Sequence, residues 1–164
     1  TAHALSTSPF AVFVAAYSLA LAAVSDQHDF VVGAPVAGRN DEYEIGVPTL
    51  MLNMIAIRTR IDVEKKISDT VRSMISNVTE AVSFGDSVFS KVVSEFADHT
   101  NEDPLFSTMV NMLTYPSLEF WDGDRSLHLT ELNTGFTKYD ASLYIQRHGE
   151  DYTCLLYTSD AADE

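Results

Sequence analysis

The spacing between apolar residues differs from one segment of this chain to the next. The first clear pattern is an apolar stretch from Phe10 to Val24. Ser8 is a residue type that caps helix N-termini, and Pro9 suits the first helical position. The pattern predicts a buried helix from Pro9 to about Val24. The stretch is shorter than the roughly 20 residues that span a bilayer. It also lacks the basic start of a signal peptide, because Arg39 is the first Lys or Arg in the chain.

A second apolar pattern, over residues 29–58, predicts two strands with a loop between them. The first strand begins with the β-forming residues Phe30, Val31 and Val32. The residues that interrupt a regular strand follow directly: Gly33, Pro35 and Gly38. We therefore expect the chain to leave the sheet there. Asn53 lies inside the second apolar run, where an unsatisfied buried amide costs about 1–3 kcal/mol, so it is predicted to be hydrogen-bonded or to face a cavity.

Two amphipathic helices are predicted after this strand pair. In the first, the apolar residues recur at helical spacing: Val63, Ile67, Val71, Met74, Ile75 and Val78. The second follows Asp86, an N-cap residue type, and places four apolar residues on one face: Val88, Val92, Val93 and Phe96. The later sequence predicts strands at residues 106–115, 118–121, 126–132 and 139–146, because Pro, Gly, Asp and Asn separate its β-forming runs.

The chain is acidic, with a formal net charge of −14. A field of that sign disfavours nucleic acid and anionic membrane surfaces, so we expect neither as a partner. We interpret the acidic segment 98–103 as solvated and predict no metal site there. Cys154 is the only Cys, so no disulfide framework is predicted, and a reducing cytoplasm is the expected location.

The last residues, 154–164, read CLLYTSDAADE, which matches the translation of a transposon-type library adapter. We interpret this tail as non-native, with the natural chain expected to extend beyond both ends of residues 1–153. Without the tail's three acidic residues, Asp160, Asp163 and Glu164, the net charge changes from −14 to −11.

Two motifs in the strand pair carry a family resemblance. Residues 31–39 read VVGAPVAGR, and the next strand carries Asn53 followed by Arg58. This order resembles the condensation domains of non-ribosomal peptide synthetases, which have VVGxPVAGR and then GxxxNxxxxR. Thr49 stands where that second motif has Gly, which bears on the local backbone because Thr tolerates positive φ poorly.

Further marks of the family follow the same order from Ser8 to about Tyr152. The Ser8-Pro9-Phe10 helix entry is shared. Residues 84–93 resemble HQDxPFEKLV, keeping the Asp, Phe, Lys and final Val but lacking the His, Pro and Glu. Residues 103–106 resemble (N/D)PLF, which opens a core strand, and residues 137–143 resemble xKFDLTL.

The resemblance implies an α/β fold, namely the C-terminal lobe of a chloramphenicol-acetyltransferase-like two-lobed fold with a mixed sheet flanked by helices. Residues 1–153 would be this lobe of a partial condensation domain. Its partners would be the N-terminal lobe, peptidyl carrier proteins and an adenylation domain. No cofactor would bind directly, because the substrates are carried on phosphopantetheine. The family's second His in HHxxxDG assists attack of an amine on a thioester, and that motif is absent here, so no catalytic residue is predicted.

Candidate site residues follow from the resemblance. The tunnel floor would contain Met51, Asn53 and Arg58, and the latch between the lobes would contain Thr137, Lys138 and Asp140. The motif loop would contain Gly33, Pro35, Gly38 and Arg39. In the structural alternative, Asn53 only satisfies nearby backbone groups. Arg39 and Arg58 are alternatively phosphate clamps or partners of carboxylates, and Lys138 beside Asp140 has the same two interpretations.

Three functions are consistent with the sequence. The first is amide-bond formation on a synthetase, and the second is a freestanding acyltransferase of the same fold. The third is a degenerate domain that binds partner proteins without catalysis, which the motif departures keep open. No G-x-S-x-G elbow, P-loop, HExxH or dinucleotide fingerprint occurs, which argues against the commonest hydrolase, NTPase, metalloprotease and Rossmann functions.

Overall fold

The computed structural model describes residues 2–38, 42–45, 47–96, 105–113, 119–122, 124–128 and 137–159. The chain divides into two units, Thr1–Val110 and Asn111–Glu164. Its helices are η1 (His3–Leu5), α1 (Pro9–Ser25), α2 (Glu42–Ile45), α3 (Ile67–Ser83) and α4 (Phe89–Phe96). Its strands are β1 (Asp29–Ala37), β2 (Leu52–Arg60), β3 (Thr108–Leu113), β4 (Glu119–Asp122), β5 (Arg125–His128), β6 (Ala141–His148) and β7 (Asp151–Thr158). Arg39 and the acidic segment 98–103 lie outside the described residues.

Helix α1 begins where its capping residues predict. The Ser8 Oγ accepts a hydrogen bond from the Ala11 N–H at 3.2 Å, and Pro9 occupies the first turn. The helix ends at Ser25, and its C-cap Asp26 has a left-handed backbone (φ 57°) and donates its N–H to the Ala22 carbonyl at 3.0 Å. The prediction of a buried helix holds for one face only, because Ala16, Ala20, Ala23 and Val24 are exposed.

Strand β1 pairs antiparallel with β2 along its whole length, so the prediction that the chain leaves the sheet at Gly33 is wrong. The pairing explains how Pro35 is tolerated. The Gly38 N–H donates to the Met51 carbonyl at 2.7 Å, and hydrogen-bonded pairs alternate with non-bonded ones in an antiparallel ladder. Pro35 lies opposite Met54 in a non-bonded pair, where the backbone nitrogen points away from β2. The missing N–H therefore removes no bond between the two strands.

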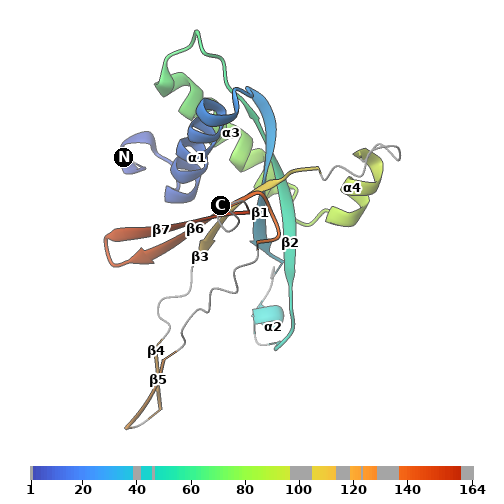
Figure 1. The fold of residues 1–164 in the computed structure, drawn as a ribbon. Coiled ribbons are helices and arrows are strands. Elements are labelled where there is room, and N and C mark those ends of the chain that lie inside the picture. Colours follow the sequence, from blue (N-terminus) through green and yellow to red (C-terminus); the bar gives the residue numbers. More distant parts are fainter. Residues whose placement is uncertain are drawn as a thin grey trace. The chain divides into compact units, whose positions relative to one another are not determined.

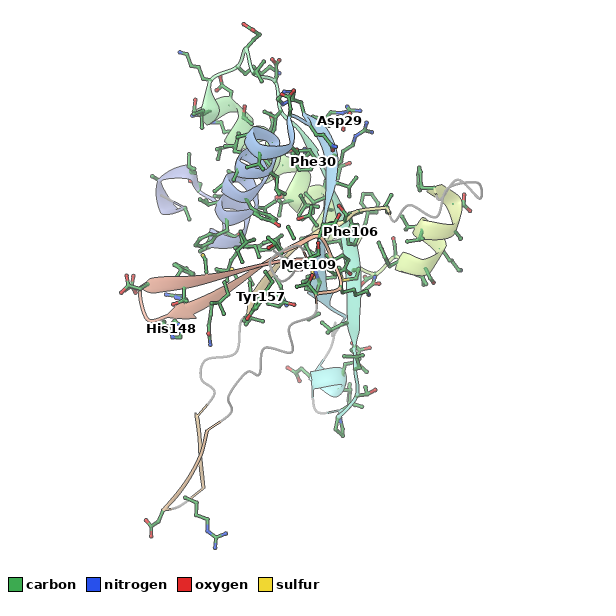
Figure 2. All side chains as sticks on the ribbon, in the orientation of Figure 1. Asp29, Phe30, Phe106, Met109, His148 and Tyr157 are labelled. Atoms are coloured by element: carbon green, nitrogen blue, oxygen red, sulfur yellow. The ribbon has the colours of Figure 1, made fainter. Side chains whose placement is uncertain are left out.

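Gly33 is required by packing rather than by a turn. Its backbone is extended and bridges to Met109 of β3 in parallel orientation. A Cβ placed at Gly33 would overlap the ring of Phe106, which is buried and contacts the ring of Phe89 at a centroid distance of 5.6 Å. Figure 2 shows Phe106 and Met109 beside this part of β1. The absent side chain makes room for an aromatic residue from a distant part of the sequence.

The opposite face of the β1–β2 pair forms the core with two helices. Its buried residues are Val32, Ala34, Ile55, Ile57 and Thr59. Helices α1 and α3 contact each other, and α3 contacts β2 (Figure 1). Two hydroxyl pairs connect α1 to the strands: Tyr17 Oη to Thr108 Oγ1 at 2.6 Å, and Ser18 Oγ to Thr59 Oγ1 at 3.3 Å. Burial raises the pKa of Tyr17, while its bond to Thr108 acts in the opposite direction.

Both amphipathic helices form, with shifted boundaries. Met74 and Val78 of α3 are buried as their spacing predicts, together with Thr70. Val63 and Ile67 are exposed, which corrects the predicted apolar face, because the helix begins only at Ile67. Helix α4 begins at Phe89, so Val88 rather than Asp86 precedes it, and the predicted cap is wrong. None of its residues is fully buried.

The second unit contains two antiparallel strand pairs, β4 with β5 and β6 with β7. Gly149 forms the turn of the second hairpin with a positive φ of 63°. In the first unit β1 pairs antiparallel with β2 and bridges in parallel to β3, so the sheet is mixed as predicted. Strand β7 is an addition to the predicted elements, and it continues from Asp151 into the first residues of the tail. The interpretation of the tail as adapter-derived stays a prediction.

The contact between Gly33 and Phe106 yields a stability prediction. We expect Gly33→Ala to lower the free energy of unfolding by about 1–3 kcal/mol, because the added methyl group overpacks against the Phe106 ring. Urea denaturation measures the change. In a Phe106→Leu background the same substitution should be less harmful, since the smaller side chain can yield. Equal losses in both backgrounds would contradict the proposed clash.

Candidate functional site

Asn53 connects strand β2 to the turn between α3 and α4. Its side chain is half-buried, and its Nδ2 donates to the carbonyls of Gly85 and Ser87, both at 2.6 Å. The amide is therefore hydrogen-bonded, as the sequence predicts, and its contacts are those of the structural alternative. A role in a tunnel floor involves a second lobe and stays a prediction. The two bonds bring together two segments that resemble family motifs.

An open hollow of about 440 Å³ lies around this contact. Its described lining comprises Gly38, Glu44, Met51, Leu52, Asn53, Gly85, Asp86 and Val88. Leu52 and Val88 are each more than half exposed, so a bound group would cover apolar surface there. The described lining has two carboxylates and no Lys or Arg. The exposed apolar side chains of this lining suit an apolar group.

The motif-loop residues divide between two places. Gly38 lines the hollow, where its backbone pairs with Met51. Gly33 lies under Phe106, and Pro35 lies opposite Met54 within the β1–β2 ladder. Thr49, at the position of the motif's Gly, does not have positive φ, since among the described residues only Ser6, Asp26 and Gly149 do. The substitution therefore introduces no strain of that kind.

Arg58 lies near the other end of β2 from Met51 and forms an ion pair. Its Nε and Nη2 donate to the two Asp29 carboxylate oxygens at 2.9 and 2.8 Å, and Arg60 Nε adds a bond at 3.2 Å. Figure 2 shows Asp29 at this end of the β1–β2 pair. Hydrogen bonding from Arg58 lowers the pKa of Asp29 from 3.8 to about 2, with Arg60 contributing in the same direction. The structure therefore engages Arg58 with a carboxylate and separates it from the hollow.

A second hollow of about 390 Å³ lies between this end of β2 and α3. Its described lining comprises Ala56, Arg58, Arg60, Asn77, Glu80, Ala81 and Phe84. Asn77 Nδ2 donates to the Arg58 carbonyl at 3.0 Å, which satisfies a backbone group on the edge strand. Asp29 forms ion pairs with both arginines that line this hollow.

The predicted latch residues lie in the second unit, just before β6. Thr137 Oγ1 donates to the Tyr139 carbonyl at 2.7 Å, and Lys138 Nζ lies 5.4 Å from the centre of the Tyr139 ring. The Asp140 carbonyl accepts from the Ser159 N–H at 3.0 Å. These contacts are local, and the latch role stays a prediction.

Sequence reasoning missed five residues that line the hollow: Glu44, Leu52, Gly85, Asp86 and Val88. Glu44 belongs to α2, a four-residue helix inside a segment with no clear periodicity. The sequence indicates a helix cap at Asp86 and an ordinary apolar run at Leu52. No local pattern identifies them as lining residues, because the hollow exists only once the α3–α4 turn meets the end of β2.

The sequence matches the condensation domain family over residues 1–161. The chain belongs to the condensation domain family. Membership of this family accounts for the resemblance of the segments around Asn53 and Gly85 to motifs of condensation domains. In the structure these two segments are hydrogen-bonded to each other. Within the described residues, no helix combines the length and apolar character needed to cross a membrane.

The curated relatives of this condensation domain include subunits of plipastatin and surfactin synthases. One of the plipastatin synthase subunits of Bacillus subtilis (strain 168) is 27% identical over 165 residues, which cover 99% of this chain and 5% of that protein. Surfactin synthase subunit 1 of the same strain is 26% identical, covering 94% of this chain and 4% of that protein. The chain therefore spans a small fraction of the relatives that it matches.

Solved structures show the same fold. The condensation domain of the monacolin K polyketide synthase MokA superposes with a TM-score of 0.78 at 18% identity, covering 99% of this chain and 38% of that one. A four-domain nonribosomal peptide synthetase bound to AMP and glycine gives 0.80 at 16% identity, covering 94% and 13%. These likenesses confirm the predicted fold class.

The Asp29 ion pair predicts a specific pH dependence. We expect the Asp29 carboxyl to titrate at about pH 2 in the folded chain, against an ordinary value of 3.8. Since the folded pKa is the lower one, the pair stabilises the fold above pH 3.8, and this contribution is lost as the pH falls toward 2. Carbon-13 NMR of the side-chain carboxyl measures the pKa, with Arg58→Gln as the variant that should raise it. An unshifted midpoint in the wild-type chain would contradict the ion pair.

Proposed function

We propose that this chain is the C-terminal lobe of a condensation domain that forms an amide bond in non-ribosomal peptide synthesis. The donor would be an acyl or peptidyl group, and the acceptor an aminoacyl group, each tethered to the phosphopantetheine of a peptidyl carrier protein. Support comes from the family, whose members form amide bonds, and from relatives that belong to peptide synthases. The observation that carries the proposal is the Asn53 contact, which joins two motif segments around a hollow.

The chemistry requires a proton acceptor that this lobe does not provide at the hollow. When the acceptor nitrogen attacks the thioester carbonyl carbon, a C–N bond forms and the C–S bond breaks. The amine loses a proton, and the thiolate leaving group gains one. The described lining contains no His, the side chain that most often serves as a general base. The base would be the second His of an HHxxxDG motif in the N-terminal lobe.

The contribution of this lobe is positioning. Holding an amine and a thioester in register converts a bimolecular step into one that resembles an intramolecular reaction, which is worth about 7–11 kcal/mol in favourable cases. A rigid wall of the site supplies part of that gain. The remaining partners would be the N-terminal lobe and an adenylation domain, and the absence of Cys before residue 154 is compatible with the cytoplasm as the location.

The activity of the isolated lobe tests whether this lobe only positions substrates while the N-terminal lobe supplies the base. We expect residues 1–164 alone, assayed in the fraction that stays soluble and monomeric, to form no amide product from carrier-bound donor and acceptor, because the base lies elsewhere. The complete domain from the parent gene should form the product under the same conditions. Mass spectrometry of the carrier-bound products measures both. Product formation by the isolated lobe would contradict the assignment, as would a parent gene without a preceding lobe that carries HHxxxDG.

The surface of the lobe yields a second expectation. Large apolar side chains are strongly exposed, including Leu50 (83%), Phe96 (75%) and Phe84 (63%). Exposed apolar surface of this kind promotes association. We expect residues 1–153 alone to express poorly or aggregate, measured by size-exclusion chromatography with light scattering. A monomer that melts cooperatively would show that the lobe does not depend on its partner.

A further inference from the structure

One side chain of β2 holds the turn between α3 and α4, and this suggests a role beyond that of a tunnel wall. We propose that Asn53 is a positioning residue: it holds residues 85–87 against the end of β2 and so sets the shape of the hollow. The hollow then receives the acyl or aminoacyl end of a tethered substrate. This inference rests on the proposed function and identifies the substrate portion that the site would take.

The geometry uses the full donor capacity of the amide. A primary amide has two N–H groups, and both acceptors of Asn53 lie at 2.6 Å. The acceptors are the carbonyls of Gly85 and Ser87, which flank Asp86 on its two sides. Fixing two carbonyls two residues apart restricts the backbone of the residue between them, and Asp86 is part of the hollow's lining.

Backbone hydrogen bonds attach the same turn to the end of α3. The Gly85 N–H donates to the Val82 carbonyl at 2.9 Å, and the Ser87 N–H donates to the Phe84 carbonyl at the same distance. These bonds set the local shape of the turn. The Asn53 amide adds the connection to β2.

Gly85 has little free space at this junction. A Cβ placed there would lie 3.0 Å from the Val82 carbonyl oxygen and 3.5 Å from Val36 Cγ2. Val36 is the register partner of Asn53 on β1. The turn therefore lies against two paired side chains: Val36 is within packing distance of a Cβ at Gly85, and Asn53 hydrogen-bonds to the Gly85 carbonyl. A methyl group at Gly85 should displace the turn without altering the Asn53 side chain.

The composition of the hollow indicates which part of a substrate it takes. Met51 precedes β2 and Leu52 begins it, while Asp86 and Val88 come from the turn that Asn53 holds. Leu52 and Val88 expose apolar surface in the hollow, which an apolar acyl or aminoacyl side chain would cover. The affinity for that part of the substrate should therefore depend on the placement of the turn.

Asn77 of α3 provides a matched control. Its Nδ2 also donates to a backbone carbonyl, that of Arg58 on β2, at 3.0 Å, but it lines the other hollow. Replacing Asn77 with Ala removes an amide–carbonyl bond to β2 without touching the turn. It therefore reports the general effect of losing such a bond.

The experiment compares Asn53→Ala, Gly85→Ala and Asn77→Ala in the complete parent protein. Three quantities are measured: steady-state turnover with carrier-bound substrates, calorimetric affinity for a non-hydrolysable aminoacyl-pantetheine amide, and hydrogen exchange of the amides of residues 86–88. We expect Asn53→Ala and Gly85→Ala to raise KM and Kd about tenfold, comparable to losing one or two hydrogen bonds, with kcat changed less. Exchange at residues 86–88 should accelerate in Asn53→Ala. Asn77→Ala should leave KM and Kd near the wild-type values.

The outcomes separate the inference from the proposed function. If the wild type turns over and Asn53→Ala matches Asn77→Ala in KM and Kd, the positioning role is wrong while the proposed function stands. If the wild type binds the analogue without turnover, the catalytic assignment fails, and the shift in Kd alone decides the role of Asn53. A parent that neither binds nor turns over overturns both. If Asn53→Ala does not fold, Gly85→Ala decides, and an unchanged Kd in that folded variant would contradict the inference.

Discussion

The antiparallel register between β1 and β2 is the constraint on which the candidate site depends. It pairs Val36 with Asn53 and Asp29 with Arg60, which places an amide at one end of the ladder and an ion-paired cluster at the other. Side chains alternate between faces with a period of two, so a slip by one residue would move Asn53 to the opposite face of the sheet. The buried residues Ile55 and Ile57 share its face, and their contact with the helices opposes such a slip. Core packing and site geometry are therefore set by the same pairing.

Local signals allowed the helices to be predicted, and long-range contacts account for what was missed. Ser8 and Pro9 act within one turn, so the start of α1 is readable from neighbouring residues. The role of Gly33 depends on the ring of Phe106, which no local pattern connects to it. The same limit applies to Pro35, because its tolerance depends on which pairs of the ladder carry hydrogen bonds. Glycine and proline favour turns when only neighbouring residues are considered, whereas here they fit positions inside a strand.

The candidate site likewise has some features that neighbouring residues predict and others that only long-range contacts determine. The position of Asn53 among apolar neighbours predicts that its amide is hydrogen-bonded. Only the fold identifies the partners, which are the carbonyls of Gly85 and Ser87. Arg58 belongs to the same motif, and the structure gives it a different environment, with both carboxylate oxygens of Asp29 in contact. Two residues that are close in a motif therefore have separate surroundings, because a strand five residues long covers about 17 Å. Sequence proximity within a strand does not make one site.

The chemical nature of the Asn53 contact suits a lobe that positions substrates and leaves proton transfer to its partner. An amide does not titrate in the accessible pH range, so its two hydrogen bonds to the Gly85 and Ser87 carbonyls do not depend on its protonation state. The Asp29 pair, by contrast, weakens in acid, because its contribution depends on an ionised carboxyl group. Under the proposed function, a neutral clamp would add no net charge near the acceptor amine, whose nucleophilicity depends on being unprotonated. The turn around Asp86 would then keep its geometry through a reaction in which protons move.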